Sequence, residues 1–401
     1  MLFRSRGDLR NVPVWSPDGT QLAFSRDGDV WVVNANGGGL RKLTPGIGYA
    51  STEPQWDPLG RTTSEIGGTP VSPGVPTDSR VRNDVLETRH TIGYLSADGS
   101  RAVVAYGAGP NCVELWNVPA RALTRFASPS DCVDEAPDGF LELVLAGTRV
   151  AWLTFGTGNH LYMSVDTASL LRPAPVGVQI SCLGRSCAYA GEGDLQGDHS
   201  LLVFDTWQQR GGPCEDHTCF RQKKTNGTLW RIVGSRALRI RSEKAGLTAL
   251  SVDAGKVAIL RSDGSIELLR GDGSLVRAFS FRPGEVRGAE LTGLQLVVQK
   301  RDGISVYDAG SGRLAHSFRV PRGGLLTDAQ SGIAVYVAGR IVHLLRLVDG
   351  KDVAIRAPGE GSVHAQIEPP GLFYSYSAPG SPRPGRVAFV PFKTLLQLLG
   401  S

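Results

Sequence analysis

The stretch Pro-Val-Trp-Ser-Pro-Asp-Gly-Thr-Gln-Leu-Ala-Phe at residues 13–24 shows the pattern on which the whole chain is built. Within it, residues 16–19 combine a Pro, which presets φ, with a Gly, which accepts a positive φ, as a tight turn requires. Leu22 and Phe24 then alternate with less apolar positions, so that one face of an extended segment is apolar. The stretch therefore predicts short β-strands joined by tight turns.

The same order of turn and short apolar strands recurs along the chain. Its central strands are marked by Leu22, Val103, Val150, Val257, Leu296, Ile333 and Leu372. The last four of these positions are spaced by 39, 37 and 39 residues. A repeat of about 40 residues with four short strands is typical of a propeller blade. We therefore predict an all-β fold, a single β-propeller of seven or eight four-stranded blades over residues 1–401, in which neighbouring blades bury one another.

The composition agrees with this fold class. The chain contains 51 Gly and 24 Pro spread over its length, while hydrophobic residues still make up 41%. This excludes disorder, collagen and helical bundles, because frequent turns accompany enough apolar residues to form a core. The 43 basic and 38 acidic residues are dispersed, which argues against nucleic acid as a partner. No apolar run is long enough for a transmembrane segment.

Two regions interrupt the repeat. Residues 50–90 begin like a second copy of the first motif and then become rich in Gly and Pro, which predicts an irregular segment or a degraded blade. Residues 207–227 insert a Cys-containing loop between two strands. Long loops in compact domains are often functional, so both segments are candidate contact surfaces.

The six cysteines form local groups, with Cys112 and Cys132 flanking one segment and two further pairs with four residues between their members. The complete set is Cys112, Cys132, Cys182, Cys187, Cys214 and Cys219. An even number in local groups predicts disulfides and an extracytoplasmic location, although the first seven residues show no signal peptide. Alternatives are a zinc site that includes His217, or free thiols.

The chain carries few signs of catalysis. The string at residues 184–188 places Ser186 in a sequence that lacks the final Gly of a nucleophile elbow, and no metalloprotease or phosphate-binding motif is present. His343 alternates with apolar residues, so we expect a strand position with backbone partners for its ring. His160 and His343 are the histidines that could line a central channel. Aspartates before glycine, including Asp98, Asp263 and Asp272, are expected to cap their own turns. We predict no catalytic residues, cofactor or metal.

The motif Trp15-Ser16-Pro17-Asp18-Gly19, with the strand that follows it, resembles the WD40-like PD40 repeat of TolB-type propellers. The later chain is similar to secreted actinobacterial propeller proteins of unassigned function. The resemblance implies an extracytoplasmic, non-catalytic binding propeller, and it implies no substrate.

Together these observations predict a monomeric, non-enzymatic binding or scaffold protein that acts through its loop rim in the bacterial envelope or outside the cell. Its partner would be a protein or a peptide. The alternative is an enzyme of the lyase or glycosidase type, with a site in the central channel. That alternative requires carboxylates or histidines from several blades to converge.

Overall fold

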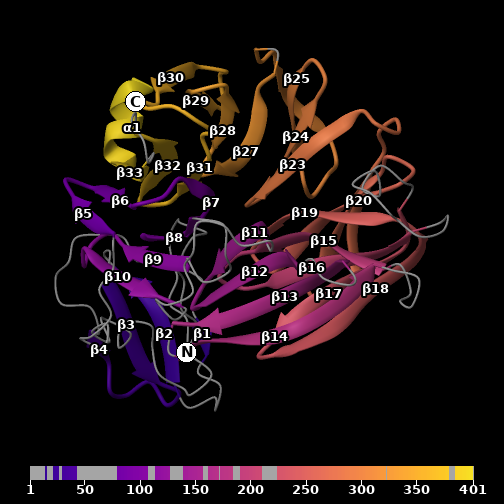
Figure 1. Cartoon of the computed structure of the whole chain (residues 1–401), viewed down its shortest axis with the longest axis horizontal. Coiled ribbons are helices and arrows are strands. Elements are labelled where there is room, and N and C mark those ends of the chain that lie inside the picture. The colour runs from indigo at the N-terminus through magenta and orange to yellow at the C-terminus, as the bar shows by residue number, and fades with distance from the viewer. Residues whose placement is uncertain are drawn as a thin grey trace. The chain divides into compact units, whose positions relative to one another are not determined.

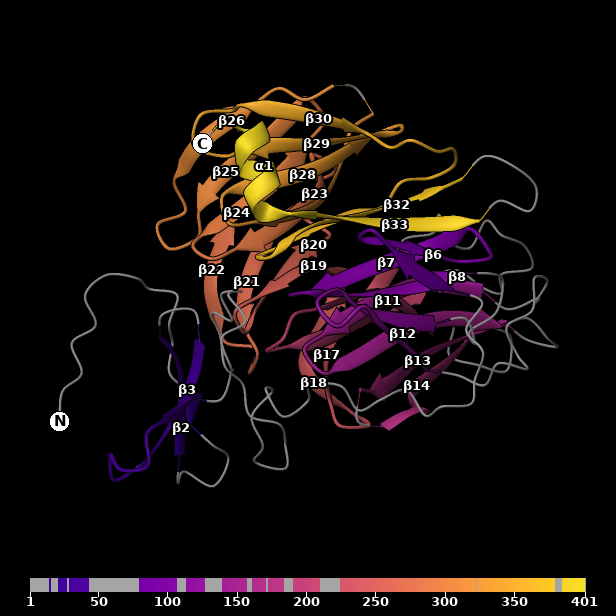
Figure 2. The same cartoon turned by 90° about the vertical axis from the view of Figure 1, so that its left-hand side faces the viewer.

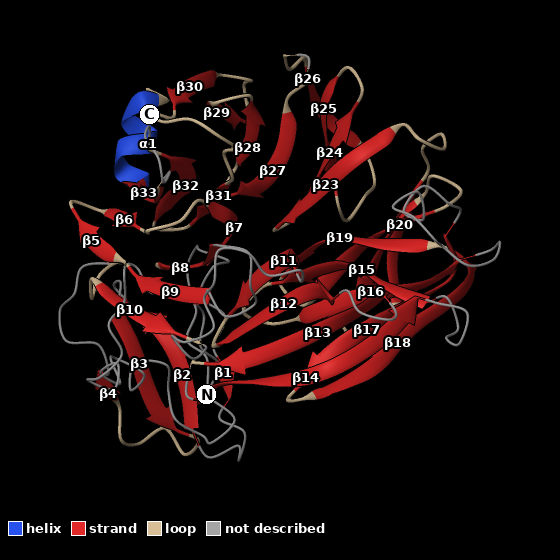
Figure 3. Ribbon diagram, viewed as in Figure 1, coloured by secondary structure: helices blue, strands red, loops and turns tan. Residues whose placement is uncertain are grey.

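The computed structural model describes a set of segments separated by gaps, and every structural statement below concerns these residues. They are 14–15, 21–26, 29–42, 79–106, 113–126, 139–156, 161–170, 172–183, 190–209, 224–321, 323–378 and 384–400. The chain divides into two compact units, Met1–Pro73 and Gly74–Ser401. Nearly all regular structure in the described segments is strand (Figure 3).

The first unit contains one antiparallel sheet of four strands in chain order. They are β1 (Val14–Trp15), β2 (Gln21–Arg26), β3 (Asp29–Asn34) and β4 (Arg41–Lys42). Of the repeat motif, Trp15 lies in β1 and pairs with Leu22 of β2. The other four motif residues, Ser16 to Gly19, lie outside the described residues.

The second unit contains seven sheets, which we number as blades 1 to 7. Blade 1 comprises β7 (Ile92–Asp98), β8 (Arg101–Tyr106), β9 (Val113–Asn117) and β10 (Ala122–Arg125). Blade 2 comprises β11 (Gly139–Ala146), β12 (Arg149–Gly156), β13 (Leu161–Ser169) and β14 (Arg172–Leu183). Blade 3 comprises β15 (Ala190–Gly197), β16 (Leu202–Gln209), β17 (Lys224–Val233) and β18 (Arg236–Ala245).

The remaining blades follow the same antiparallel order. Blade 4 comprises β19 (Leu247–Asp253), β20 (Lys256–Arg261), β21 (Ile266–Arg270) and β22 (Leu275–Phe279). Blade 5 comprises β23 (Val286–Thr292), β24 (Gln295–Lys300), β25 (Gly303–Asp308) and β26 (Leu314–Phe318). Blade 6 comprises β27 (Leu325–Gln330), β28 (Ile333–Ala338), β29 (Ile341–Arg346) and β30 (Asp352–Arg356).

Blade 7 closes the unit by joining its two ends. It comprises β31 (Ala365–Glu368), β32 (Gly371–Ser377), β33 (Gly385–Pro391), β6 (Val85–Glu87) and β5 (Arg80–Arg82). Strand β33 pairs with β6, so that Val387 lies opposite Leu86, and both side chains are buried with Phe373. Residues 80–87, inside the segment expected to be irregular, therefore supply two short strands to the last blade.

The first strands of the seven blades contact one another in a closed circle, β7, β11, β15, β19, β23, β27, β31 and back to β7 (Figure 1). We call them the inner strands. This arrangement confirms the predicted all-β propeller, and the second unit forms a ring of seven blades. The expectation of one domain over residues 1–401 stays a prediction.

The core lies between blades. In β20, Val257 and Ile259 pack toward blade 3, while Ala258 between them packs toward blade 5, and all three are fully buried. Alternation along a strand thus supplies apolar side chains to both neighbours. Burial of each larger side chain contributes about 1.5–3 kcal/mol.

One helix, α1 (Phe392–Leu398), follows β33 and lies beside β32 and β33 (Figure 2). Leu395 of α1 and the following Leu399 are buried in the core between blades 6 and 7. Within the described residues, no helix is long and apolar enough to cross a bilayer.

Candidate functional site

One side of the ring is built from tight turns that are hydrogen-bonded to each other. In blade 6, Leu347 N–H donates to Gly332 O at 2.8 Å, and in blade 5 Ala309 N–H donates to Leu294 O at 2.8 Å. Each bond joins the turn after the third strand to the turn after the first strand, so both turns lie on the same side. We call this side the turn face. It consists of residues 99–100, 118–121, 147–148, 170, 198–201, 234–235, 254–255, 271–274, 293–294, 309–313, 331–332, 347–351 and 369–370.

Carboxylates at the ends of inner strands connect this face from blade to blade. Asp98 accepts the N–H of Gly147 in blade 2, and Glu368 of blade 7 accepts the N–H of Gly99 in blade 1 at 3.2 Å. Asp253 likewise accepts the N–H of Gly293 in blade 5. Each acceptor therefore satisfies a turn N–H of the next blade around the ring.

The expectation that Asp98 caps its own turn is wrong, because its carboxylate reaches across to the next blade. Asp263 and Asp272 do cap their own turns, accepting the N–H groups of Ser265 and Ser274 at 2.9 Å each. The three aspartates look alike in sequence. They differ because only Asp98 lies at the end of an inner strand, next to another blade.

The inner-strand carboxyls are crowded and poorly hydrated. Burial raises the pKa of Asp328 to about 7, although the N–H groups of Ile367 and Ala329 bond to its carboxylate. Burial, followed by the nearby charge of Asp328, raises the pKa of Glu290 well above its usual range. Burial and then the charges of Asp98 and Asp328 do the same for the pKa of Glu368. Carboxyls from several blades thus lie near one another, as the enzyme alternative requires.

In the described parts of the chain, no group of three His, Cys, Asp or Glu side chains could hold a metal ion. Of the predicted disulfide cysteines, Cys182 lies in β14 and the other five lie outside the described residues, as do His160, Ser186 and His217. The disulfide, zinc and free-thiol alternatives therefore stay predictions.

His343 lies in β29, as expected for a strand residue, but its partner is not a backbone group. Its Nδ1 is 3.1 Å from a carboxylate oxygen of Asp352, and its ring stacks on Tyr336 with centroids 4.4 Å apart. The hydroxyl of Tyr336 donates to the same carboxylate. This cluster joins β28, β29 and β30 within one blade.

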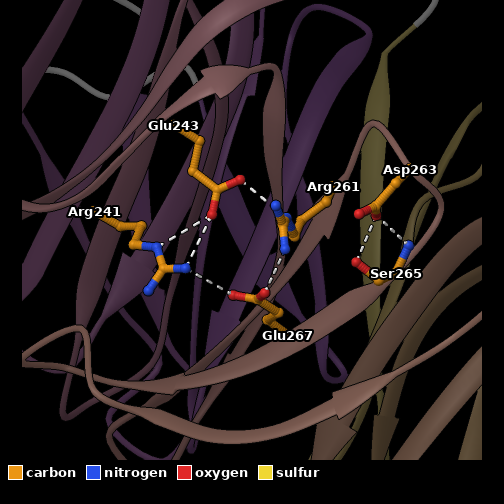
Figure 4. A network of polar contacts seen from close by, with 6 residues as sticks. All are labelled: Arg241, Glu243, Arg261, Asp263, Ser265 and Glu267. Atoms are coloured by element: carbon orange, nitrogen blue, oxygen red, sulfur yellow. Dashed lines mark hydrogen bonds and ion pairs between the residues drawn. The ribbon is translucent and has the colours of Figure 1, made fainter.

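A second charged cluster ties blade 3 to blade 4 (Figure 4). Arg241 of β18 contacts Glu243 at 3.1 Å and Glu267 at 3.4 Å. Arg261 of β20 contacts the same two carboxylates at 2.9 and 2.8 Å. Two arginines and two glutamates therefore alternate, and each charge has two opposite neighbours.

A pocket opens where blade 5, blade 6 and α1 meet at the turn face. Its volume is about 250 Å³, and it is lined by Gln295, His316, Ser331, Gly332, Ile333, Arg346, Leu347, Val348, Leu396 and Leu399. This volume lies below the range of about 300–1,000 Å³ that is usual for drug-sized ligands. The lining contains no acidic residue. The pocket therefore fits one or two apolar side chains of a larger partner better than a whole small molecule.

The turns and the helix that line this pocket also carry exposed apolar side chains. Val348 and Leu294, both in turns, are 69% and 68% exposed. Leu314 directly follows the turn after β25, and Leu398 ends α1; both are also exposed. Two further exposed apolar residues, Val233 and Leu275, border turns of blades 3 and 4 on the turn face.

Sequence reasoning missed this surface because it looked for contacts in long loops. A signal was nevertheless present. Turns usually carry polar residues and Gly, whereas Leu294 directly follows Gly293, and Leu347 and Val348 precede Asp349-Gly350. Apolar residues inside tight turns are therefore the sequence feature that marks it.

No family model matches the chain, and no curated protein matches it. Among solved structures, it is similar to a chain of the mitotic checkpoint complex at 12% identity and a TM-score of 0.50, covering 81% of this chain and 99% of that chain. The WD40 β-propeller domain of Doa1 matches at 13% identity and a TM-score of 0.45, over 75% of this chain and 93% of that chain. Saccharomyces cerevisiae Sqt1 matches at 9% identity and a TM-score of 0.41, over 94% and 95% of the two chains. At such low identities the similarity concerns the fold alone.

Proposed function

We propose that this protein is a non-enzymatic binding protein that holds a protein or peptide partner on its turn face. The observation that carries the proposal is the pocket between blade 5, blade 6 and α1, whose turns and helix also carry exposed apolar side chains. Contiguous exposed apolar surface on a folded protein commonly marks an interaction site. The ring of blades supplies the rigid support that such a site needs.

The direct test is site-specific photo-crosslinking in an extract of the source cells. A photoreactive residue at Val348 is expected to give a defined adduct with a partner protein, whereas one at Leu325 is not. Leu325 is the matched control, because it is 60% exposed but begins β27, at the end of the strand opposite the turn face. Adducts from Leu325 alone would move the site to the other side, and adducts from neither position would reject the proposal.

We propose as well the cellular location, the disulfides and the contact segments that the sequence predicts. The TolB-like motif and the paired cysteines support a role in the bacterial envelope or outside the cell. Thiol titration of denatured protein isolated without reductant should then find almost no free Cys, and six titratable thiols would overturn this location. The expected contact segments 50–90 and 207–227 lie largely outside the described residues and stay predictions.

One observation favours a second candidate function, an enzyme of the lyase or glycosidase type. Asp328, whose pKa is raised to about 7, remains partly protonated at neutral pH and lies near Glu290, as a general acid beside a second carboxyl would. Its hydrogen bonds to two backbone N–H groups favour a structural role instead. Turnover of a panel of chromogenic glycosides that disappears in Asp328→Asn would support the enzyme. Equal rates in both proteins would exclude Asp328 as its acid.

A further inference from the structure

We infer that the partner segment held at the turn face is acidic and amphipathic, with an apolar side chain seated in the pocket and carboxylates on either side of it. The inference rests on the proposed function and adds the chemistry of the partner. Three features of the described residues carry it: the charge of the pocket lining, the charge of the surrounding turns, and the way the chain's own helix occupies the neighbouring surface.

The pocket lining is mainly apolar and includes two side chains with basic groups. Among its described residues, Arg346 and His316 are the titratable ones. The guanidinium of Arg346 already bonds to the carboxylate of Asp349 and to Leu399 O at 3.3 Å, so it is held in place at the pocket. The apolar lining residues Ile333, Leu347, Val348, Leu396 and Leu399 favour an apolar side chain of the partner in the pocket.

Basic groups outnumber acidic ones in the turns on this part of the turn face and in the residues that border them. The cations are Arg270, Arg277, Arg313, Arg346, Lys351 and Lys393, against the anions Asp272, Asp308, Asp349 and Asp352. Three of these anions, Asp272, Asp308 and Asp349, bond to N–H groups of their own turns, at Ser274, Ser311 and Lys351. These bonds hold the pKa of Asp272 and Asp308 below the usual value, and the Arg346 guanidinium followed by the N–H of Lys351 does so for Asp349. A formal surplus of two positive charges remains and attracts acidic segments.

Two of these cations are placed to meet a bound segment. Arg313 is exposed and directly precedes Leu314 at the start of β26. Lys351 is exposed in the turn that carries Val348, and its Nζ lies so close to Gly400 that a Cβ there would be 2.6 Å away. The two side chains therefore belong to the turns on either side of the pocket, at blade 5 and blade 6.

The chain itself shows how a helix lies on this surface. In α1, Phe392, Leu395 and Leu396, with the following Leu399, have the spacing of one helical face. Leu395 and Leu399 are buried against the blades, whereas Leu396 and Leu399 form one wall of the pocket. A partner segment with apolar residues three and four apart can use the same mode of packing on the other side of that wall.

A peptide-display selection on the immobilised full-length protein tests the inference. Selected peptides are expected to contain Leu, Ile, Phe or Met flanked by Asp or Glu. In fluorescence anisotropy, Arg313→Glu and Lys351→Glu should each weaken a selected peptide at least tenfold. Arg356→Glu, an exposed arginine at the far end of β30, should change its affinity less than twofold.

The variant Val348→Asp distinguishes two claims, that a partner binds at the turn face and that this partner is acidic. Peptides that lose binding in Val348→Asp but are basic or uncharged would overturn the acidic partner and leave the turn-face site intact. Peptides whose binding is unaffected by Val348→Asp, Arg313→Glu and Lys351→Glu would overturn both. The Leu325→Asp variant, on the opposite side, should bind as the unsubstituted protein does.

Discussion

The ring contains two groups of carboxyls that meet opposite electrostatic conditions. Between blades 3 and 4, Glu243 and Glu267 are each held between Arg241 and Arg261 (Figure 4). At the inner strands, Glu290, Asp328 and Glu368 lie near other carboxyls, and backbone or hydroxyl groups are their hydrogen-bond donors. Both arrangements connect neighbouring blades. In the first, each carboxylate contacts two guanidinium groups, whereas in the second, burial raises the pKa of the acids and so favours their protonated forms.

The difference shows in the pKa of the charged groups themselves. For Arg261, burial lowers the pKa, but the carboxylates of Glu243 and Glu267 outweigh burial and the net shift is upward. For Asp98, burial raises the pKa, and the charge of Arg101 and the N–H of Gly147 offset it only in part. The paired carboxylates therefore outweigh burial at Arg261, whereas one arginine and one backbone N–H do not outweigh it at Asp98.

The largest effect is expected from removing one cation of the paired cluster. Arg261→Met leaves Glu243 and Glu267, whose side chains are 9% and 7% exposed, to share Arg241 alone. We expect a loss of about 2 kcal/mol in the free energy of unfolding, because a buried charge without its partner is strongly unfavourable. Urea unfolding followed by tryptophan fluorescence measures it.

The matched control is Arg356→Met, since Arg356 is an exposed arginine at the end of an outer strand. Its cost should stay within about 0.5 kcal/mol. Equal losses in the two variants would show that the cluster of Figure 4 contributes nothing beyond a surface arginine.

The next effect is a pH dependence from the inner-strand carboxyls. The folded-state pKa of Asp328 is about 7, against an ordinary value of 3.8. The folded chain therefore binds the Asp328 proton more tightly than the unfolded chain does. The stabilisation that this proton provides is complete below about pH 4 and is lost as the pH rises through about 7. We expect unfolding measured at about pH 5 and about pH 8 to show lower stability at the higher pH, and Asp328→Asn to reduce that loss by about 1–2 kcal/mol.

Asp263→Asn provides the comparison, because its own turn bonds lower the pKa of Asp263 and that group titrates below this window. In Asp263→Asn, the difference in the free energy of unfolding between about pH 5 and about pH 8 should equal that of the unsubstituted protein. A difference equally large in Asp328→Asn and in the unsubstituted protein would contradict the role assigned to Asp328.

The smallest effect is expected at a turn N–H group that donates to a carboxylate at the end of an inner strand. Asp198 accepts the N–H of Ala254 at 2.7 Å, where other blades use Gly99, Gly147 or Gly293 as donors. Ala254 has a φ of +48°, a left-handed conformation that costs a residue with a side chain more than it costs Gly. Ala254→Gly is expected to stabilise the fold by about 0.5 kcal/mol in thermal unfolding.

Ala315→Gly in β26 should have the opposite sign, because that position is exposed and in a strand, where Gly costs about 0.5–1 kcal/mol. If both substitutions destabilise the fold, the backbone strain relieved at Ala254 is smaller than the conformational entropy that Gly adds to the unfolded chain.

The sequence repeat predicted the strands within the blades, but it did not predict how the ring of blades closes. Central strands around Val257, Leu296 and Ile333 follow at a regular spacing and carry apolar runs, so local pattern suffices to find them. Strand β6 is three residues long and its partner β33 lies near the other end of the chain. No local sequence pattern therefore predicts that the two strands pair. The candidate site was missed for the same reason, since its pocket combines turns of two blades with the last helix.

By itself, the sequence determined the all-β propeller, because turns and alternation act over a few residues and recur in every blade. Tertiary structure alone decided which carboxyls face cations and which face each other. Asp98 and Asp263 both precede a Gly, yet one bonds to the next blade and the other to its own turn. It also decided that Gln295, Val348 and Leu396 line one pocket. Such neighbours are set by ring closure, which brings together residues that are far apart along the chain.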